Sequence, residues 1–262
     1  MGYIGRKFRE RRILFPQSSR GLIVPLDHGL TAGPMPGLQS LEDVQGWICS
    51  RDISAVLAHK GMIERLIQRD MLHSATGVIV HLNGMASIAP DPDTKIMVAN
   101  IETALELGAD AVSIQANFTP ENFQHNVAMI GTLTDAAHAV GLPILVMLYD
   151  KVQPATPGDR LRRQNHLLRI LADLGSEAVK LAFPESLDGV SELLGRHARD
   201  IRIFFAGGQA TREDILFSTA RAAMESGASG MCIGRNVFQH PKPKQFLNRL
   251  AMCIQGHEEL VT

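Results

Sequence analysis

The sequence has few cysteines, almost no net charge and no long apolar run. Its 262 residues include only three cysteines (Cys49, Cys232 and Cys253), without a Cys-x-x-Cys pair. This excludes a disulfide framework and a zinc ribbon, and it fits a reducing cytosol. The formal net charge is −1, so nothing favours nucleic acid as a partner. No apolar run is long enough to span a membrane. We therefore expect a cytoplasmic protein that binds neither nucleic acid nor a membrane.

The chain divides into a short basic extension, residues 1–20, and one domain, residues 21–262. The first twelve residues are basic but lack the apolar core of a signal peptide, and we expect a solvated arm or a short helix there. Hydrophobic residues make up 45% of the chain and charged residues 20%, which is enough apolar surface for a substantial core.

Eight short apolar runs alternate with helical patterns along the chain. The runs cover residues 21–28, 53–60, 77–83, 109–117, 142–149, 176–183, 201–206 and 228–233. The helical patterns cover residues 41–50, 62–74, 95–107, 121–140, 160–174, 186–199, 211–226 and 243–255. Continuous apolar runs are typical of parallel strands covered by helices. The alternation predicts an α/β fold, a (β/α)8 TIM barrel, with a doubly wound sheet as the alternative. Pro25 lies inside the first run and weakens the assignment of its register.

Lys180 is the residue that fits its strand least well. Side chains alternate along a strand, so Lys180 shares a face with Ala178 and Ala182, while Val179 and Leu181 face the other way. Burial disfavours the ammonium form, and a neutral amine is the nucleophile that forms a Schiff base with a carbonyl. The alternative is a lysine at an exposed strand end that reaches water.

Glycines follow the last two predicted strands, where a barrel commonly binds phosphate. Gly207 and Gly208 end the seventh, and Gly234 and Arg235 end the eighth. Glycines let the backbone amides approach an anion closely, and a guanidinium group can bind phosphate in a bidentate manner. We also expect Thr211 to cap the helix that follows. The alternative is two tight turns that need glycine for conformational reasons.

Other polar residues stand at the predicted strand ends. The phenol of Tyr149 could exchange a proton with a substrate hydroxyl, or it could be an amphipathic tyrosine at the rim of the core. Asp27 could orient a substrate hydroxyl or pair with Lys180, or it could serve a turn. Lys60 is a candidate second cation or a surface lysine, and His28 and Asn83 are candidate substrate ligands.

Three histidines, His28, His59 and His81, end successive strands and raise the possibility of a metal site. None of them shares a short ligand spacing with another, and we expect no metal. We interpret the helical histidines, among them His197, as surface residues.

The segment from Val24 to Gly37, Val-Pro-Leu-Asp-His-Gly-Leu-Thr-Ala-Gly-Pro-Met-Pro-Gly, resembles the first-strand motif of the archaeal-type class I aldolases. This family contains fructose-bisphosphate aldolases and 2-amino-3,7-dideoxy-D-threo-hept-6-ulosonate synthases. Further segments resemble it in the same order: residues 57–61, 81–84, 87–95, 109–113, 206–208 and 234–240.

The resemblance implies a (β/α)8 barrel without a cofactor, in which Lys180 forms a covalent imine, Tyr149 is the general acid and base and Asp27 is a catalytic or orienting carboxylate. It implies a ketose-phosphate site at the glycines and Arg235 described above. It also implies a homo-oligomer, with decamers among the family's assemblies.

Two segments depart from the family pattern at the mouth of the site. The family usually has Pro-Arg-Gly after its tyrosine, where this chain has residues 150–152, Asp-Lys-Val. After the lysine it commonly has a polar run similar to Thr-Asn-Tyr, where this chain has residues 181–184, Leu-Ala-Phe-Pro. Both changes leave the Schiff base intact and fall where substrates are chosen.

We therefore expect a metal-free class I aldolase or transaldolase that acts on a phosphorylated ketose or deoxyketose and an aldehyde such as aspartate semialdehyde. Fructose-bisphosphate cleavage and thiolase-like acyl transfer are the alternatives within the family. A metal-dependent hydrolase and a non-catalytic sugar-phosphate-binding protein are the alternatives outside it.

Overall fold

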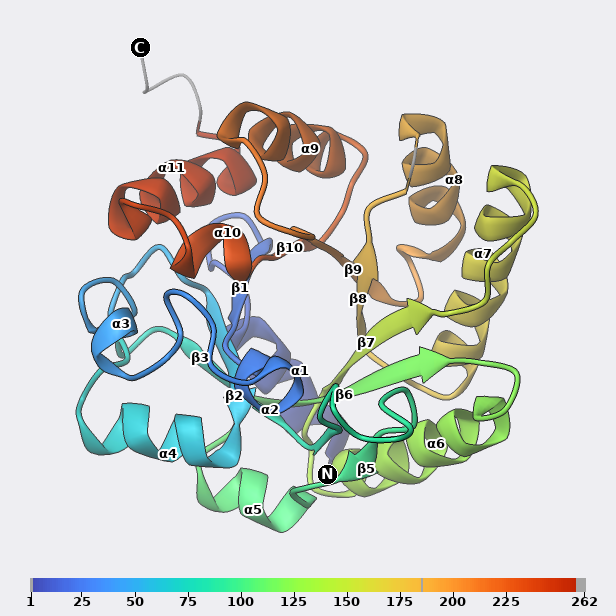
Figure 1. Ribbon diagram of the computed structural model, residues 1–262, viewed down its shortest axis with the longest axis horizontal. Helices are drawn as coiled ribbons and strands as arrows, with labels where there is room; N and C mark the ends of the chain where they lie inside the picture. Colours follow the sequence, from blue (N-terminus) through green and yellow to red (C-terminus); the bar gives the residue numbers. More distant parts are fainter. Residues whose placement is uncertain (1, 185, 258–262) are drawn as a thin grey trace.

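A closed barrel of eight parallel strands forms the centre of the molecule (Figure 1). The computed structural model describes residues 2–184 and 186–257. The barrel strands are β1 Gly21–Pro25, β2 Ala55–His59, β3 Gly77–His81, β6 Ala111–Phe118, β7 Ile144–Asp150, β8 Ala178–Ala182, β9 Arg202–Ala206 and β10 Gly230–Cys232. Strand β1 pairs with β2 on one side and with β10 on the other. This pairing closes the sheet, confirms the predicted barrel and rules out the doubly wound alternative.

A ring of helices surrounds the barrel (Figure 1). Its members are α3 Glu42–Gln45, α4 Lys60–Gln68, α5 Ile101–Glu106, α6 Phe123–Ala139, α7 Pro157–Asp173, α8 Leu187–His197, α9 Glu213–Glu225 and α11 Pro243–Gln255. Local signals set some of the ends. The side chain of Thr156 accepts a hydrogen bond from the amide of Asp159 at the start of α7, and Gly256 ends α11 in the left-handed conformation that favours glycine. Within the described ranges, no helix combines the length and apolarity needed to cross a bilayer.

The structure corrects several predicted elements. The helix expected over 95–107 begins only at Ile101, because Asn100 caps it, and the residues before it include strand β5 Ile96–Met97, which pairs with β4 Asn83–Gly84. The helix expected over 41–50 is a single turn, α3. Two short helices, α2 His28–Ala32 and α10 Arg235–Phe238, were not predicted.

The apolar residues form two layers, one inside the barrel and one between the barrel and its helices. Alternation along β8 places Ala178 in the interior cluster and Val179 and Leu181 in the outer one, as the sequence pattern predicts. Pro25 is the last residue of β1 and pairs with Leu57 of β2. At the end of the strand its missing amide donor interrupts no ladder, so the strand assignment holds.

The basic N-terminal segment is helix α1, Gly2–Arg12, which confirms the short helix and not the solvated arm. Its side chains bind residues at the start of the barrel strands. Arg6 lies 2.9 Å from the carboxylate of Glu177, and Glu10 pairs with Arg202. The helix therefore lies at the amino-terminal end of the barrel and leaves the carboxyl end open.

Candidate active site

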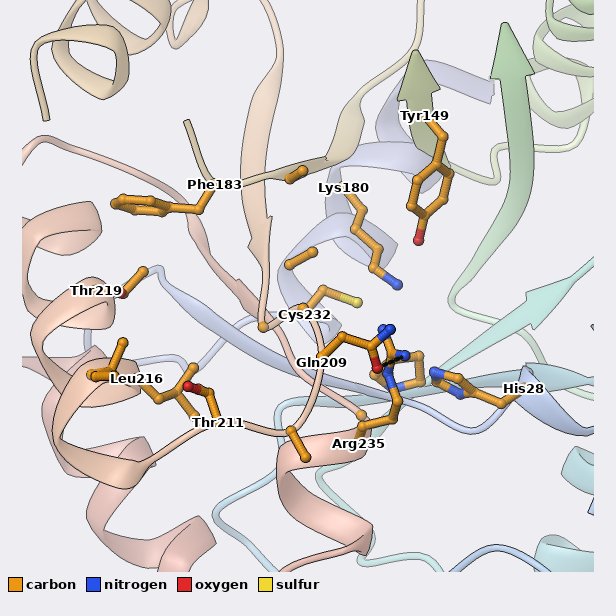
Figure 2. Close-up of a pocket in the computed structure, with 18 residues that line it drawn as sticks. His28, Tyr149, Lys180, Phe183, Gln209, Thr211, Leu216, Thr219, Cys232 and Arg235 are labelled. Atoms are coloured by element: carbon orange, nitrogen blue, oxygen red, sulfur yellow. Dashed lines mark hydrogen bonds between the residues drawn. The ribbon is translucent and has the colours of Figure 1, made fainter. Parts of the chain in front are cut away.

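A cavity of about 520 Å³ lies at the carboxyl ends of the barrel strands. Seven of the predicted site residues line it: His28, Tyr149, Lys180, Gly207, Gly208, Gly234 and Arg235. Figure 2 shows four of them, His28, Tyr149, Lys180 and Arg235, gathered around one opening. These residues are far apart in the sequence, and the pairing of β1 with β10, which closes the barrel, brings them together. Asp27, Lys60 and Asn83 do not line this cavity.

Lys180 points into the barrel from the middle of β8. Its side chain is buried, with 7% of the residue exposed, and Nζ lies 3.5 Å from the sulfur of Met147 on β7. The interior cluster packs below it with Ala178 and Phe204. Lys180 is therefore no lysine at an exposed strand end, and its amine faces the cavity.

The charge state of Lys180 differs from the expectation. Burial lowers the pKa of its amine, but the negative charges that Tyr149, Cys232 and Asp27 can carry, together with a hydrogen bond to Tyr149, raise the pKa above its usual value. The expectation that burial alone frees the amine is therefore wrong for the free protein. Lys180 is an ammonium ion at neutral pH, and it must transfer a proton as it attacks a carbonyl.

Tyr149 stands beside this amine. It lies near the end of β7, two residues after Met147, whose backbone is in register with Lys180. Figure 2 shows its hydroxyl directed toward the amine of Lys180. A phenol in this position can exchange protons both with the lysine and with a substrate bound to it.

Asp27 is buried next to the site. Its Oδ1 has no hydrogen-bond partner among the described residues, and the Nδ1 of His28 is 3.6 Å away. Burial raises the pKa of the carboxyl group, but the nearby His81, His28 and Lys180 groups together lower it, and Lys180 is the one among them that is charged at neutral pH. Asp27 is therefore a carboxylate, and it acts on Lys180 through its charge without lining the cavity.

The turns after β9 and β10 form the opposite wall. Gly208 has φ 69°, a conformation that favours glycine. A Cβ on Gly234 would lie 2.9 Å from the carbonyl oxygen of Pro25 and 2.8 Å from the ring of His28. Both glycines are thus needed for backbone shape, as the tight-turn interpretation requires, and both leave backbone exposed to the cavity, as a phosphate site requires.

Asn236 holds these two turns together, a role that the sequence did not reveal. It is buried, and its amide donates to the carbonyls of Gly207, at 3.0 Å, and Gln209, at 3.1 Å. Its oxygen accepts from the amide of Thr211 at 2.8 Å. Thr211 therefore does not cap α9, which begins at Glu213 and has no side-chain cap.

The guanidinium of Arg235 donates a hydrogen bond to the side-chain oxygen of Gln209 (Figure 2). The glutamine holds the cation over the glycine turn after β9. A neutral amide leaves the charge of the guanidinium uncompensated, so the pair presents one positive charge and several backbone amides to the same space. Such an arrangement binds a phosphate group well.

The histidines at the strand ends do not form a metal site. In the described part of the chain, no group of three or more His, Cys, Asp or Glu side chains is placed to hold a metal ion. His81 is buried, and its Nδ1 is 2.8 Å from the hydroxyl of Ser113. Its ring lies 4.9 Å from that of His59. Burial lowers the pKa of His81 to about 3, so it is neutral. The helical His197, expected at the surface, is also buried.

Lys60 and Asn83 are placed away from the cavity. Lys60 is exposed and begins helix α4. Asn83 is fully buried, and its amide exchanges two hydrogen bonds, of 2.9 and 2.8 Å, with the backbone of Gln115 on β6. The polar atoms of Asn83 are thus used to hold β4 against the barrel. Neither Lys60 nor Asn83 is part of the candidate active site.

Comparison with known proteins points to an aldolase family, in agreement with the geometry of the site. The model of the DeoC/LacD family of aldolases matches residues 21–240. The chain is 31% identical over 258 residues to 2-amino-3,7-dideoxy-D-threo-hept-6-ulosonate synthase 1 of Archaeoglobus fulgidus, covering 97% of this chain and 92% of that protein. It is 29% identical over 252 residues to 2-amino-4,5-dihydroxy-6-oxo-7-(phosphonooxy)heptanoate synthase of Streptomyces griseus, covering 96% and 90%.

The fold is similar to that of an archaeal fructose-1,6-bisphosphate aldolase whose catalytic lysine is covalently bound to the carbinolamine intermediate of the substrate. The TM-score is 0.82 at 22% identity, over 96% of this chain and all of that one. At this identity the likeness concerns the fold.

Proposed function

Because the chain belongs to the DeoC/LacD aldolase family, we propose that it is a Schiff-base aldolase or transaldolase that joins part of a phosphorylated ketose or deoxyketose to an aldehyde. The observation that carries the proposal is the buried Lys180, which faces a cavity with a tyrosine hydroxyl beside it. A Schiff base draws electrons from the neighbouring carbon–carbon bond, which is the chemistry that an aldolase needs.

The first half of the reaction attaches the donor. The Lys180 ammonium transfers one proton through Tyr149 to the donor's carbonyl oxygen while the nitrogen attacks the carbonyl carbon. The carbinolamine then loses water and becomes a protonated imine. The proton inventory closes without an outside base, because the ammonium supplies the proton that the carbonyl oxygen gains. The raised pKa of Lys180 therefore fits this step.

The second half moves the carbon–carbon bond. When the bond next to the donor's hydroxyl breaks, its electron pair enters the imine and forms an enamine, the hydroxyl proton passes through Tyr149 to solvent, and the first aldehyde is released. The enamine carbon then attacks the incoming aldehyde, whose oxygen takes the proton back. Water hydrolyses the new imine and restores the Lys180 ammonium. General acid–base catalysis of this kind contributes about 10²- to 10⁴-fold.

The donor's phosphate binds between the two glycine turns. Gly207, Gly208 and Gly234 offer backbone without side chains, and Arg235 supplies the charge. His28, half-buried in the same lining, has a pKa lowered mainly by burial, so it serves as a neutral hydrogen-bond partner for a substrate hydroxyl. No metal takes part in the proposed cycle.

Borohydride trapping tests the proposal. The protein is mixed with dihydroxyacetone phosphate, fructose 1-phosphate, fructose 1,6-bisphosphate or a deoxyketose phosphate, reduced, and read by peptide mass spectrometry. We expect an adduct on Lys180 with at least one of them. Lys180→Met removes the adduct, and the matched control Lys244→Met, at an exposed position, retains it. Folded protein that gives no adduct with any ligand contradicts the Schiff-base mechanism.

The same assay separates the alternatives. Aldehyde release from fructose 1,6-bisphosphate favours the fructose-bisphosphate aldolase, and acyl transfer to a thiol favours the thiolase-like branch. Burial raises the pKa of the Cys232 thiol to about 11, which argues against an acyl-cysteine route. Activity that survives in Lys180→Met and is lost with a chelator favours a metal-dependent hydrolase. Binding without an adduct favours a sugar-phosphate-binding protein.

Assembly into a homo-oligomer is part of the proposal. The outer face of α1 carries Tyr3, Ile4 and Phe8, each with more than 60% of its surface exposed. In an oligomer, a second subunit would cover these apolar side chains. Light scattering on the full chain measures the number of subunits and shows whether a decamer forms.

A further inference from the structure

The turn after β9 is held from its buried side by one asparagine. Residues 207–211 all line the cavity, whereas Asn236 is 6% exposed and is not among the described lining residues. Its amide donates to the carbonyl oxygens of Gly207 and Gln209, and its oxygen accepts from the amide of Thr211. An ideal Cβ on Gly207 would lie 3.2 Å from the Nδ2 of Asn236, so glycine at this position permits the contact.

These hydrogen bonds set the direction of two backbone amides. The peptide bonds of the described chain are trans, and in a planar trans unit the C=O of one residue and the N–H of the next point in opposite directions. The carbonyls of Gly207 and Gln209 point to Asn236. The amides that follow them, those of Gly208 and Ala210, therefore point away from Asn236 and toward the cavity that the turn lines.

Neither of these two amides has another use in the fold. Within the described ranges, the amides of Gly208 and Ala210 donate to no protein acceptor. Gly208 has φ 69°, and a left-handed residue in a turn gathers neighbouring amides into a concavity that binds anions. No atom lies within 4 Å of an ideal Cβ on Gly208, so there is space beside these donors for a bound group.

The cation of the site is tied to the same turn. Arg235 precedes Asn236 at the start of α10, and its guanidinium donates to the side-chain oxygen of Gln209. Gln209 therefore contacts both residues, Arg235 through its side chain and Asn236 through its backbone carbonyl. Loss of the Asn236 contacts would thus disturb the two amides and the position of the charge together.

From these contacts we infer that Asn236 is a positioning residue for the donor's phosphate. It aims the amides of Gly208 and Ala210 at the phosphate oxygens and does not touch the phosphate itself. The inference rests on the proposed function for the presence of a phosphorylated donor, and it adds the residue on which recognition of the phosphate depends. Asn236 makes no contact with Lys180 or Tyr149 in the described structure, so it should affect phosphate binding and not the chemistry of the Schiff base.

Asn236→Leu tests the inference, because leucine is similar in size and cannot donate a hydrogen bond. Calorimetry measures the Kd of inorganic phosphate, and kinetics give KM and kcat for a ketose phosphate and for the matching unphosphorylated ketose. A hydrogen bond to a charged group changes affinity by about 10- to 100-fold. We therefore expect the Kd of phosphate and the KM of the ketose phosphate to rise at least about tenfold. The value of kcat, and both constants for the unphosphorylated ketose, should stay nearly unchanged.

A second buried asparagine supplies the matched control. Asn126 on α6 is fully buried, and its amide donates to the carbonyl of Asn117 at 2.9 Å and to the side chain of Asn122 at 3.0 Å. Urea unfolding should show a loss of stability in both Asn126→Leu and Asn236→Leu, but only Asn236→Leu should lose affinity for phosphate. Asn236→Asp keeps the size and the acceptor for Thr211 and lacks both donors, so it should lose phosphate affinity as well.

Hydrogen exchange of the wild type provides a readout that needs no variant. We expect inorganic phosphate to slow exchange in the peptide that contains residues 207–211, because the amides of Gly208 and Ala210 then donate to the ion. Unchanged exchange in this peptide overturns the inference even where neither variant folds.

Two further results overturn the inference while leaving the aldolase function standing. In one, Asn236→Leu or Asn236→Asp has the circular dichroism spectrum of the wild type and binds phosphate as tightly. In the other, Asn236→Leu raises KM equally for the phosphorylated and the unphosphorylated ketose. The absence of any donor adduct on Lys180 in the wild type refutes the proposed Schiff-base function instead, and the Kd of phosphate shows separately whether Asn236 shapes an anion site.

Discussion

His81 should make the stability of the barrel depend on pH over an interval that begins above the range in which carboxylates titrate. Folded His81 is buried, with 1% of its surface exposed, and burial lowers its pKa from 6.5 to about 3. The unfolded chain returns the ring to water and to its ordinary pKa. Between these two values the unfolded state binds a proton that the folded state does not. Stability from this group is therefore complete above pH 6.5 and is lost as the pH falls toward 3.

The size of the effect follows from the two pKa values. The interval from 6.5 to about 3 spans about 3.5 pH units, and each unit is worth about 1.4 kcal/mol. His81 should thus remove about 5 kcal/mol of stability across the interval. Folded domains have only about 5–15 kcal/mol in total, so the barrel should be much weakened at pH 4.

Urea unfolding of the wild type and of His81→Asn measures this directly. The single tryptophan, Trp47, is 4% exposed, so its fluorescence reports unfolding. Asparagine keeps a polar group near the hydroxyl of Ser113 but does not titrate. The difference in the free energy of unfolding between the two proteins should shrink by about 1.4 kcal/mol per pH unit from pH 6 to pH 4.5.

Carboxylates titrate in both proteins and cancel in this difference. The exposed His166 on α7 supplies the control, since His166→Asn should follow the wild type at every pH. If His81→Asn and the wild type lose stability in parallel, His81 does not resist protonation in the folded state, and the reasoning from its burial is refuted.

Three further predictions concern the chemistry at Lys180. Tyr149→Phe should lower kcat by about 10²- to 10⁴-fold and still allow borohydride to trap the donor, and an unchanged kcat would remove Tyr149 from the proton path. Arg235→Met should raise KM about 10- to 100-fold for a ketose phosphate, as loss of one charged hydrogen bond implies, and not for the unphosphorylated ketose; equal effects on both would contradict a phosphate contact. Asp27→Asn should lower the pH of half-maximal trapping by about 1 or more, because the carboxylate helps to hold the raised pKa of Lys180, and a profile identical to the wild type would refute that coupling.

The barrel could be predicted from the sequence because its strands are buried on both faces. Each of the eight apolar runs overlaps one barrel strand, and the errors lie at the ends, where β6 and β7 each extend one residue beyond the predicted run. The short elements were missed for a related reason. Helices α2 and α10 and the pair β4–β5 have from two to five residues, too few for a periodic pattern to appear. The same limit explains why residues 95–107 were assigned to a single helix.

The site was predictable where one strand determines it and not where several strands meet. Alternation along β8 was enough to place Lys180 inside the barrel. The prediction of a neutral amine at Lys180 was wrong. Asp27, just after β1, and Tyr149 on β7 raise its pKa, and they become its neighbours only when the sheet closes. A place at a strand end also does not give the direction of a side chain, so Lys60 and Asn83 seemed equivalent to residues that do line the cavity.

The two segments that depart from the family pattern lie at the mouth of the barrel, whereas the reacting groups lie inside it. Lys180 and Tyr149 point into the barrel, where the interior cluster fixes them. Residues 150–152 and 181–184 lie at or beyond the strand ends, and Phe183 packs outward against Phe205. A change in these loops can therefore alter the shape and polarity of the cavity without moving the amine or the phenol. This separation is why changes in these two segments can alter the choice of substrate while the Schiff-base chemistry stays the same.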